Sequence, residues 1–201
     1  ELGVDSLFGL EGEIITSYNG GDGVVASATS GGGGVDIRLN NITAISNTSA
    51  GVDAFAGAVG VAAVTLDDVN ARGNGDYGVS ATALTLASNA TITANNLVLN
   101  NNATTGGLFY AAGGLTANVT VTNFTADGNV DEGVVGAVDG TLVAGVRVEG
   151  TASGNGGVGA VAIAIGTNFA SVVVNNVGAG NGGGEATATA QNSGTYQTFL
   201  P

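Results

Sequence analysis

The residues best suited to chemistry are carboxylates that follow an asparagine turn. They come two or three positions after an asparagine that recurs along the chain: Asp22, Asp76, Asp131 and Glu132. Carboxylates along one edge could bind calcium, which takes about six to eight oxygen ligands. The competing interpretation is an acidic edge that only contacts solvent. Calcium is the one metal that the sequence leaves open, and no other cofactor is predicted.

Catalytic side chains are scarce. The chain has 201 residues, no cysteine and no histidine, and its three cations are Arg38, Arg72 and Arg147. Without histidine, cysteine or lysine, the remaining catalytic arrangement is a carboxylate pair of the glycosidase type. The adjacent Asp67 and Asp68 are expected to face different ways. We therefore predict that the protein is not an enzyme.

Several asparagines match the pattern of N-glycosylation acceptors, in which Thr or Ser follows two residues later: Asn41, Asn47, Asn89, Asn102, Asn118 and Asn123. Most of these also belong to repeat positions whose side chains are expected to stabilise turns. Asn89 and Asn118 lie outside those positions, so they are the better candidates for modification.

A unit of about 27 residues positions all these side chains, and a period of this length indicates a solenoid. It is clearest at residues 64–90, VTLDDVNARGNGDYGVSATALTLASNA. One asparagine recurs in every unit: Asn19, Asn47, Asn74, Asn102, Asn129, Asn155 and Asn181. A second series consists of Asn41, Asp68, Asn96, Asn123 and Asn176, with Gly150 in its place in one unit. Asparagine tolerates the left-handed conformation and its amide can bond the next amide, so we predict that both series form turn ladders.

Alternating apolar residues predict three short strands in each unit. The first strand places small residues inward, as at Val79, Ala81 and Ala83. The second and third carry bulkier inward pairs. The predicted fold is all-β, a single right-handed parallel β-helix over residues 19–191 with about seven coils of three strands. Residues 1–18 are predicted to be a lead-in, cap or assembly strand, in which Ile14 aligns with Ile42, and residues 192–201 a cap or assembly contact.

The repeats VTLDDVNARGNGDYGV and VTVTNFTADGNVDEGV resemble the coils of right-handed parallel β-helix proteins. These are the pectate-lyase-like superfamily and its bacterial surface relatives. The resemblance covers nearly the whole chain and implies the fold and the stacked asparagines. It implies no activity, because the superfamily includes lyases, hydrolases, adhesins and inert stalks.

The outward side of the first strand is predicted to be an apolar strip, formed by Val25, Phe55, Phe109, Val135, Val161 and Ile163. An exposed apolar strip on a rod is usually an interface. The alternative is that the segments following each first strand, such as GAVGVAAV from Gly57, fold over it. Free strand edges at both ends could also add another chain. The terminal residues expected to take part are Leu7, Phe8, Leu10, Tyr196, Phe199 and Leu200.

The composition argues against several classes of binding partner. A net charge of -13 should repel nucleic acid and anionic lipid, and no apolar run is long enough to span a membrane. A chain that starts at Glu1 fits processing and secretion, so we expect an extracellular or cell-surface location. The expected partner is the protein itself, with a glycan as the second choice.

These features favour a structural subunit that assembles head to tail into a fibre or surface layer. The first alternative is a monomeric adhesin or glycan-binding stalk, whose groove would use the tyrosines: Tyr18, Tyr77, Tyr110 and Tyr196. A less favoured alternative is an ice-binding rod, based on the outward threonines Thr65, Thr91, Thr93, Thr120 and Thr122. Arginines interrupt that threonine face.

Overall fold

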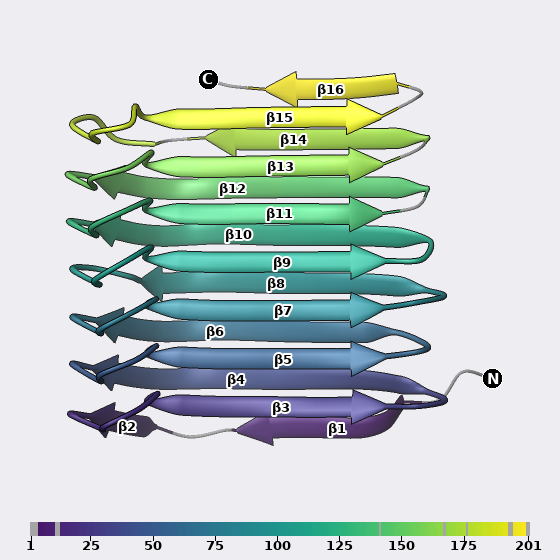
Figure 1. Cartoon of the computed structure of the whole chain (residues 1–201), viewed down its shortest axis with the longest axis horizontal. Helices are drawn as coiled ribbons and strands as arrows, with labels where there is room; N and C mark the ends of the chain where they lie inside the picture. Colours follow the sequence, from purple (N-terminus) through teal and green to yellow (C-terminus); the bar gives the residue numbers. More distant parts are fainter. Residues whose placement is uncertain are drawn as a thin grey trace.

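The chain passes back and forth between two facing sheets of parallel strands, and in each sheet the strands stack along one common axis (Figure 1). The computed structural model describes residues 4–10, 13–140, 142–166, 168–175, 177–192 and 195–199, and of residues 4–10, 192 and 195–199 it describes the backbone alone. Each coil places one short strand in the sheet that we call sheet B and one longer strand in sheet A. Branched and small side chains alternate along both strands, which suits two facing pleated sheets.

The strand bounds follow this alternation. Sheet A contains β1 (Val4–Leu10), β2 (Ile14–Ser17), β4 (Gly34–Ile45), β6 (Ala62–Arg72), β8 (Asn89–Val98), β10 (Thr116–Asp127), β12 (Val143–Ser153), β14 (Phe169–Asn175) and β16 (Thr195–Phe199). Sheet B contains β3 (Val24–Ser30), β5 (Val52–Ala58), β7 (Val79–Thr85), β9 (Gly107–Gly113), β11 (Val134–Gly140), β13 (Ala160–Gly166) and β15 (Ala186–Asn192).

The predicted all-β parallel solenoid is confirmed, with a smaller number of turns. Sheet B is 7-stranded, and the step from each of its strands to the next is one turn, which gives six turns where the sequence predicted about seven. Equivalent residues in successive coils are about 27 positions apart, as for Val52 and Val79. The described part of the chain contains no helix, and so none that could cross a membrane.

The predicted second and third strands are one continuous strand with a bend. The bend residue has a positive φ in four coils: Asn41 (56°), Asp68 (53°), Asn96 (54°) and Asn123 (53°). Asparagine and aspartate tolerate this left-handed conformation better than other residues with a side chain. The backbone pairing between coils continues on both sides of the bend, so β4, β6, β8, β10 and β12 each form two sides of a coil.

The coil of β12 lacks the bend residue, which corrects the predicted role of Gly150. Thr122 pairs with Glu149 and Phe124 pairs with Gly150, so Asn123 has no counterpart in that coil. A Cβ at Gly150 would lie 2.5 Å from Cδ1 of Phe124. The close approach of the Phe124 ring therefore explains the glycine at position 150. Asn176, the last residue of the predicted second series, lies outside the described residues.

The core is a stack of inward columns that run through every coil. Ile37, Val64, Ile92 and Val119 form one such column in sheet A, and all are at most 1% exposed. The facing sheet B columns consist mostly of alanine and valine. Each coil buries its apolar side chains against the coils on either side, which is how solenoid repeats are stabilised.

Both terminal segments add strands to sheet A. β1 and β2 each pair with β4, and the predicted pairing of Ile14 with Ile42 is present. β16 pairs in parallel with β14. Residues 1–18 were predicted as a lead-in, cap or assembly strand and residues 192–201 as a cap or assembly contact. In the structure, β1 and β16 occupy the positions of further sheet A strands at opposite ends of the stack (Figure 1).

Candidate functional site

The first asparagine series forms the predicted buried ladder at the corner between sheet A and sheet B. In each link Nδ2 of one asparagine donates to Oδ1 of the asparagine in the next coil, at 2.8–3.1 Å. The same Oδ1 also accepts the backbone N–H of the preceding asparagine, as between Asn47 and Asn74 at 3.0 Å. Asn47, Asn74, Asn102, Asn129 and Asn155 are at most 2% exposed. Buried amides require such partners, so this ladder is structural.

A glycine four positions after each ladder asparagine except Asn181 makes room for the next amide. A Cβ at Gly78 would lie 2.7 Å from Nδ2 of Asn102 and 2.5 Å from the carbonyl oxygen of Gly106. The same conflict exists at Gly23, Gly51, Gly106, Gly133 and Gly159. Because no side chain fits there, these glycines mark coils that have another coil stacked on their C-terminal side.

The ladder is closed at its C-terminal end. Nδ2 of Asn181 donates to the carbonyl oxygen of Ala152 and to that of Gly178, both at 3.0 Å. In the preceding coils, Nδ2 gives one of its two hydrogen bonds to the asparagine of the next coil. The position that is glycine in the other coils is Glu185, which is exposed. The glycine is therefore replaced by another residue in the coil where the asparagine ladder ends.

Three of the four carboxylates considered for calcium accept hydrogen bonds from a neighbouring coil. Oδ1 of Asp22 accepts the N–H of Ala50 at 2.9 Å. Oδ1 of Asp76 and Oε2 of Glu132 accept threonine hydroxyl groups, each at 3.0 Å. Asp131 is exposed. Within the described residues no three carboxylates are grouped so that they could hold a metal ion. The geometry gives these carboxylates a role in holding coils together.

The outer face of sheet A is polar and internally hydrogen-bonded. Thr65, Thr93 and Thr120 stack in one column, with Arg38 and Arg147 at its two ends. The arginines therefore lie four strands apart and cannot share a site. Each pairs with a carboxylate on its own strand: Arg38 with Asp36 at 2.6 Å and Arg147 with Glu149 at 2.7 Å.

These ion pairs shift two pKa values. The hydrogen bond from Arg147 lowers the pKa of Glu149. Burial opposes this effect, while a hydrogen bond from Asn175 and the charge of Arg147 add to it. The hydrogen bond to Asp36 raises the pKa of Arg38. Both changes favour charged forms on an exposed surface, which is typical of surface ion pairs and not of catalytic groups.

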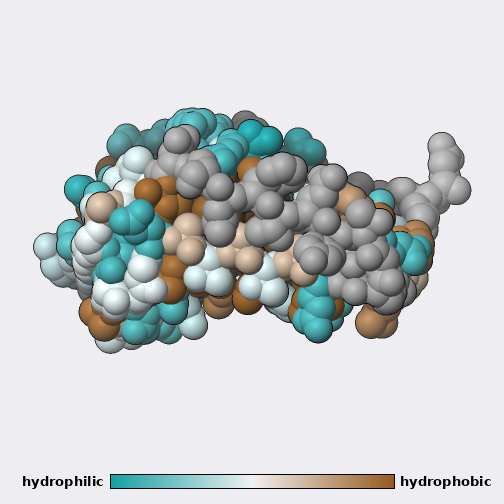
Figure 2. Space-filling view, turned by 90° about the horizontal axis from the view of Figure 1, so that it is seen from above, coloured by the Kyte–Doolittle hydropathy of each residue, from teal (hydrophilic) through white to brown (hydrophobic). Residues whose placement is uncertain are grey.

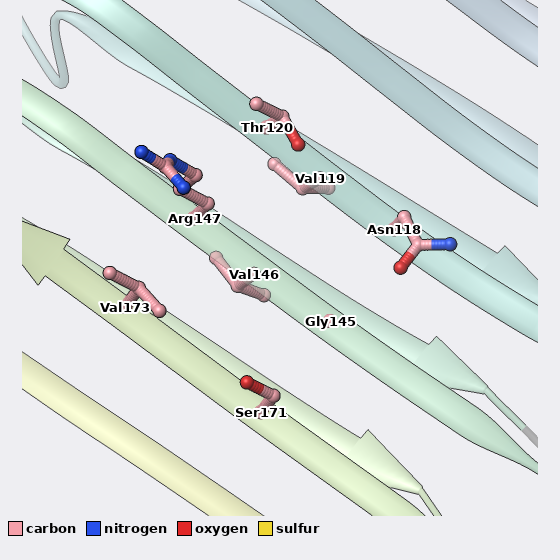
Figure 3. Close-up of a pocket in the computed structure, with 8 residues that line it drawn as sticks. All are labelled: Asn118, Val119, Thr120, Gly145, Val146, Arg147, Ser171 and Val173. Atoms are coloured by element: carbon pink, nitrogen blue, oxygen red, sulfur yellow. The ribbon is translucent and has the colours of Figure 1, made fainter. Parts of the chain in front are cut away.

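A shallow depression lies on this face over Gly145. Gly145 separates Asn118 and Ser171 on the neighbouring strands, and Arg147 lies beside it (Figure 3). A Cβ at Gly145 would lie 2.8 Å from Oδ1 of Asn118, so that side chain leans over the glycine. The depression offers hydroxyl, amide and guanidinium groups to a ligand, but no enclosed cavity.

The two preferred glycosylation candidates differ in access. Asn89 is exposed at the start of β8, where its Oδ1 accepts the hydroxyl of Thr116 at 2.8 Å. Asn118 is half-buried near the start of β10. Asn47 and Asn102 are buried in the ladder and cannot carry a sugar. Of the two, Asn89 is the better placed for modification.

The second predicted series has a different bonding pattern from the buried ladder. Its described side chains lie outside the coil, and those of Asn96 and Asn123 donate to the residue before the bend in the preceding coil. Nδ2 of Asn123 donates to Asn95 at 2.8 Å, and Nδ2 of Asn96 donates to Asp67 at 3.3 Å. The predicted amide-to-amide ladder is thus wrong for this series, because the left-handed bend turns its side chains toward solvent.

The outer face of sheet B carries the predicted apolar strip among polar residues, with one correction to the predicted residues. Val25 is 58% exposed, and Phe55, Val135, Val161 and Ile163 are half-buried by their neighbours in the column. Phe109 points inward and is fully buried. It pairs with inward Ala81, and a Cβ at Gly107 would lie 2.6 Å from its ring. Gly107 therefore provides the space that the ring occupies.

Sequence reasoning missed four members of this face: Leu84, Leu108, Tyr110 and Ile165. Counting from the ladder asparagine would have found them, because the residue seven positions later points inward in every coil. Ala81 follows Asn74 by this interval, and Phe109 follows Asn102 by the same interval. Leu108 and Tyr110, on either side of Phe109, then point outward.

No described segment folds over sheet B, which argues against the alternative that the segments after each first strand cover it. The segment that begins at Gly57 completes β5, turns at residues 59–61 and enters β6 of sheet A. The equivalent segments after β7 and β9 follow the same route. The short connections keep these residues at the margin, so the outer face of sheet B is open to solvent.

The described tyrosines do not share a groove. Tyr18 follows β2 in the first coil and is 81% exposed, Tyr77 lies in an asparagine turn, and Tyr110 lies on sheet B. The side chains of Leu7, Phe8, Leu10, Tyr196 and Phe199 lie outside the described part of the structure, as does Leu200. An aromatic glycan-binding groove is therefore not formed by the described residues.

Both ends of the stack carry strand edges with pairing on one side. In the described part of the chain, β3 and β15 end sheet B, and β1 and β16 end the main path of sheet A. Ala186, Ala188 and Ala190 of β15 are half-buried, whereas their counterparts inside the stack are buried. Seen along the stack from the C-terminal end, apolar atoms are visible between hydrophilic margins (Figure 2).

No protein-family model, curated protein or solved structure matches this chain. The structure itself shows a parallel β-solenoid with a buried asparagine ladder.

Proposed function

We propose that this protein is a structural subunit that assembles head to tail into an extracellular fibre or surface layer. The observation that carries the proposal is the pair of sheet B edges at opposite ends of the stack. β3 at one end and β15 at the other are parallel members of the same sheet. Such edges are templates for another chain, and a joint between unlike ends repeats without closing.

The inward columns of the two edges are compatible. Ala186, Ala188 and Ala190 of one copy would be followed by Val24, Ala26 and Ala28 of the next. Small residues succeed one another in the same way inside the stack, as Ala54 follows Ala26. A joint of this kind would bury the half-exposed alanines of β15.

The asparagine corner limits how closely two copies can join. Glu185 occupies the position where a stacked coil requires glycine, and the last amide of the ladder already donates to Gly178. The joint that we propose therefore follows the strand edges and leaves this corner open. The extracellular location is part of this proposal and is consistent with the exposed glycosylation acceptor Asn89.

Backbone geometry identifies substitutions that block each edge separately. The N–H of Val24 donates to Gly51 and that of Ala160 donates to Glu185, each at 3.0 Å, so these residues point their N–H toward the C-terminal side. Because the direction alternates along a parallel strand, Ala188 points its N–H toward the free edge of β15. Ser27 points its N–H toward the free edge of β3. Proline at either position removes an edge donor without removing an internal one.

The test is to compare the wild type with Ser27→Pro and Ala188→Pro by electron microscopy and sedimentation velocity at increasing concentration. The wild type should form unbranched rods that lengthen with concentration, and each variant alone should remain one subunit long. A mixture of the two variants has one usable joint, so it should stop at pairs. Wild-type protein that stays one subunit long, or proline variants that lengthen like the wild type, would refute the proposal. Far-UV circular dichroism checks that the fold is retained.

A further inference from the structure

The outer face of sheet B has the composition of an interface over most of its length. Phe55, Tyr110, Val135, Val161, Ile163 and Ile165 lie on it, on four of its strands. Its central column, from Ser27 of β3 to Thr189 of β15, contains no charged residue. The carboxylates of this face, Asp53 and Asp139, lie in its two outer columns. Ser27, Thr82 and Thr189 interrupt the central column, so the apolar residues are most continuous over β9, β11 and β13. An exposed apolar patch of this kind is normally covered by a partner.

Sheet A provides an internal comparison. Its outer face carries both ion pairs and a row of side-chain hydrogen bonds that includes those of Asp67 and Asn95. The two faces have the same strand spacing and belong to the same repeats, but only the face of sheet B lacks these polar contacts at its centre. The difference between the faces therefore reflects their side chains and not the geometry of the fold.

The dimensions of the face suit a second copy. Strands about 4.8 Å apart and residues about 3.3 Å apart give seven strands of seven residues an area of roughly 700 Å². Stable protein interfaces bury about 800 Å² on each partner. Two such sheets can pack face to face at about 10 Å, with the same surface contributed by both copies.

The charge of the chain also bears on the choice of partner. Each copy has a net charge of -13, so two copies repel each other at low ionic strength. The acidic residues of the face lie at its margins, where salt can screen them. Pairing of two copies should therefore strengthen as salt is added, whereas binding of a basic partner should weaken.

We propose that two copies of this protein associate side by side through the outer faces of their B sheets. This contact is lateral and is independent of the head-to-tail joint. A filament that used both contacts would be two subunits wide.

The test uses the Ala188→Pro protein, because this substitution lies on the inward side of β15 and blocks head-to-tail growth without changing the outer face of sheet B. Side-by-side pairing is then measured alone. Sedimentation equilibrium in 50 mM and in 500 mM sodium chloride should show a dimer whose dissociation constant falls at the higher salt concentration. Adding Ile163→Asp, or the milder Ile165→Thr, should raise that dissociation constant about tenfold or more. Thr93→Asp places the same new carboxylate in the central column of sheet A, and it should have little effect.

Two results would overturn the inference. One is an edge-blocked protein that remains monomeric at both salt concentrations. The other is equal weakening of the dimer by Ile163→Asp and Thr93→Asp. Neither result would affect the head-to-tail proposal, which is tested by the rod length of the wild type and of the mixed variants. Circular dichroism and the urea midpoint of each variant show whether it is folded under the conditions of the measurement.

Discussion

At the scale of single residues, the side chains of the asparagine ladder depend most on their hydrogen-bond partners, because they are buried. Asn102 donates to Asn129 and to the carbonyl oxygen of Ala71, and it accepts two hydrogen bonds from Asn74. All of these groups are shielded from water. A ladder position in the middle of the stack should therefore be much more sensitive to substitution than the last one.

We expect Asn102→Ala to lower the free energy of unfolding by about 2–4 kcal/mol, because it leaves more than one buried polar group without a partner. Asn181→Ala should cost about half as much or less, since Asn181 is partly exposed and only one coil lies against it. Urea unfolding followed by circular dichroism measures both. Equal losses for the two variants would contradict the view that burial makes the ladder essential.

Arg147 lowers the pKa of Glu149 on the outer face of sheet A. Replacing it by glutamine should raise the pKa of Glu149 toward that of an ordinary glutamate, because the principal hydrogen bond to the carboxylate is lost. In the wild type the lowered pKa means that the pair contributes stability above about pH 4.3 and loses it as the pH falls through the folded-state value. Carboxyl-detected NMR titration of the two proteins measures the shift. An unchanged pKa in the variant would show that Asn175 alone maintains it.

At the scale of the elements, β9 shows how one coil departs from its neighbours. Its inward residues are Gly107, Phe109 and Ala111, where β7 has Val79, Ala81 and Ala83. The ring of Phe109 fills the space that a side chain at Gly107 would take. The two positions therefore depend on each other.

Phe109→Ala should cost about 3–5 kcal/mol of unfolding free energy, as for other buried aromatic residues. Gly107→Ala should also destabilise the protein, because its Cβ would contact the ring. In the double variant the added methyl group occupies part of the vacated space, so the combined cost should be at least about 1 kcal/mol below the sum of the two. A full thermodynamic cycle by urea unfolding measures this coupling, and strict additivity would refute it.

The elements also show what sequence could and could not predict. The spacing of asparagine and glycine predicted the parallel solenoid, the period and the buried corner, because each follows from local backbone geometry. The orientation of Phe109 was missed because its size argued against a column of alanines. Only the compensating space at Gly107 explains it, and that space depends on the packing between coils. The single strand around each bend was missed because one left-handed residue does not interrupt pairing between coils.

At the scale of the whole molecule, the two ends decide how large an assembly can become. Glu185 stands where every preceding coil has glycine, and it prevents another asparagine corner from stacking there. This residue should weaken the joint between copies without affecting the stack below it.

Glu185→Gly should therefore lower the concentration at which rods elongate, about tenfold if it restores one ladder link of about 1.4 kcal/mol. Glu185→Gln removes the charge but keeps the side chain, so its elongation should remain like that of the wild type. Light scattering during a concentration series compares the three proteins. If the glutamine variant elongates as readily as the glycine variant, charge and not space controls the joint.

The strands of neighbouring coils are hydrogen-bonded along the stack axis, and β1 and β16 lie at its two ends (Figure 1). A force that pulls these ends apart acts along those hydrogen bonds and opens them one row at a time, without shearing many rows together. Each coil that peels away releases about 27 residues, or roughly 90 Å of extended chain. The rod would thus yield under tension in small repeated steps and absorb mechanical work coil by coil.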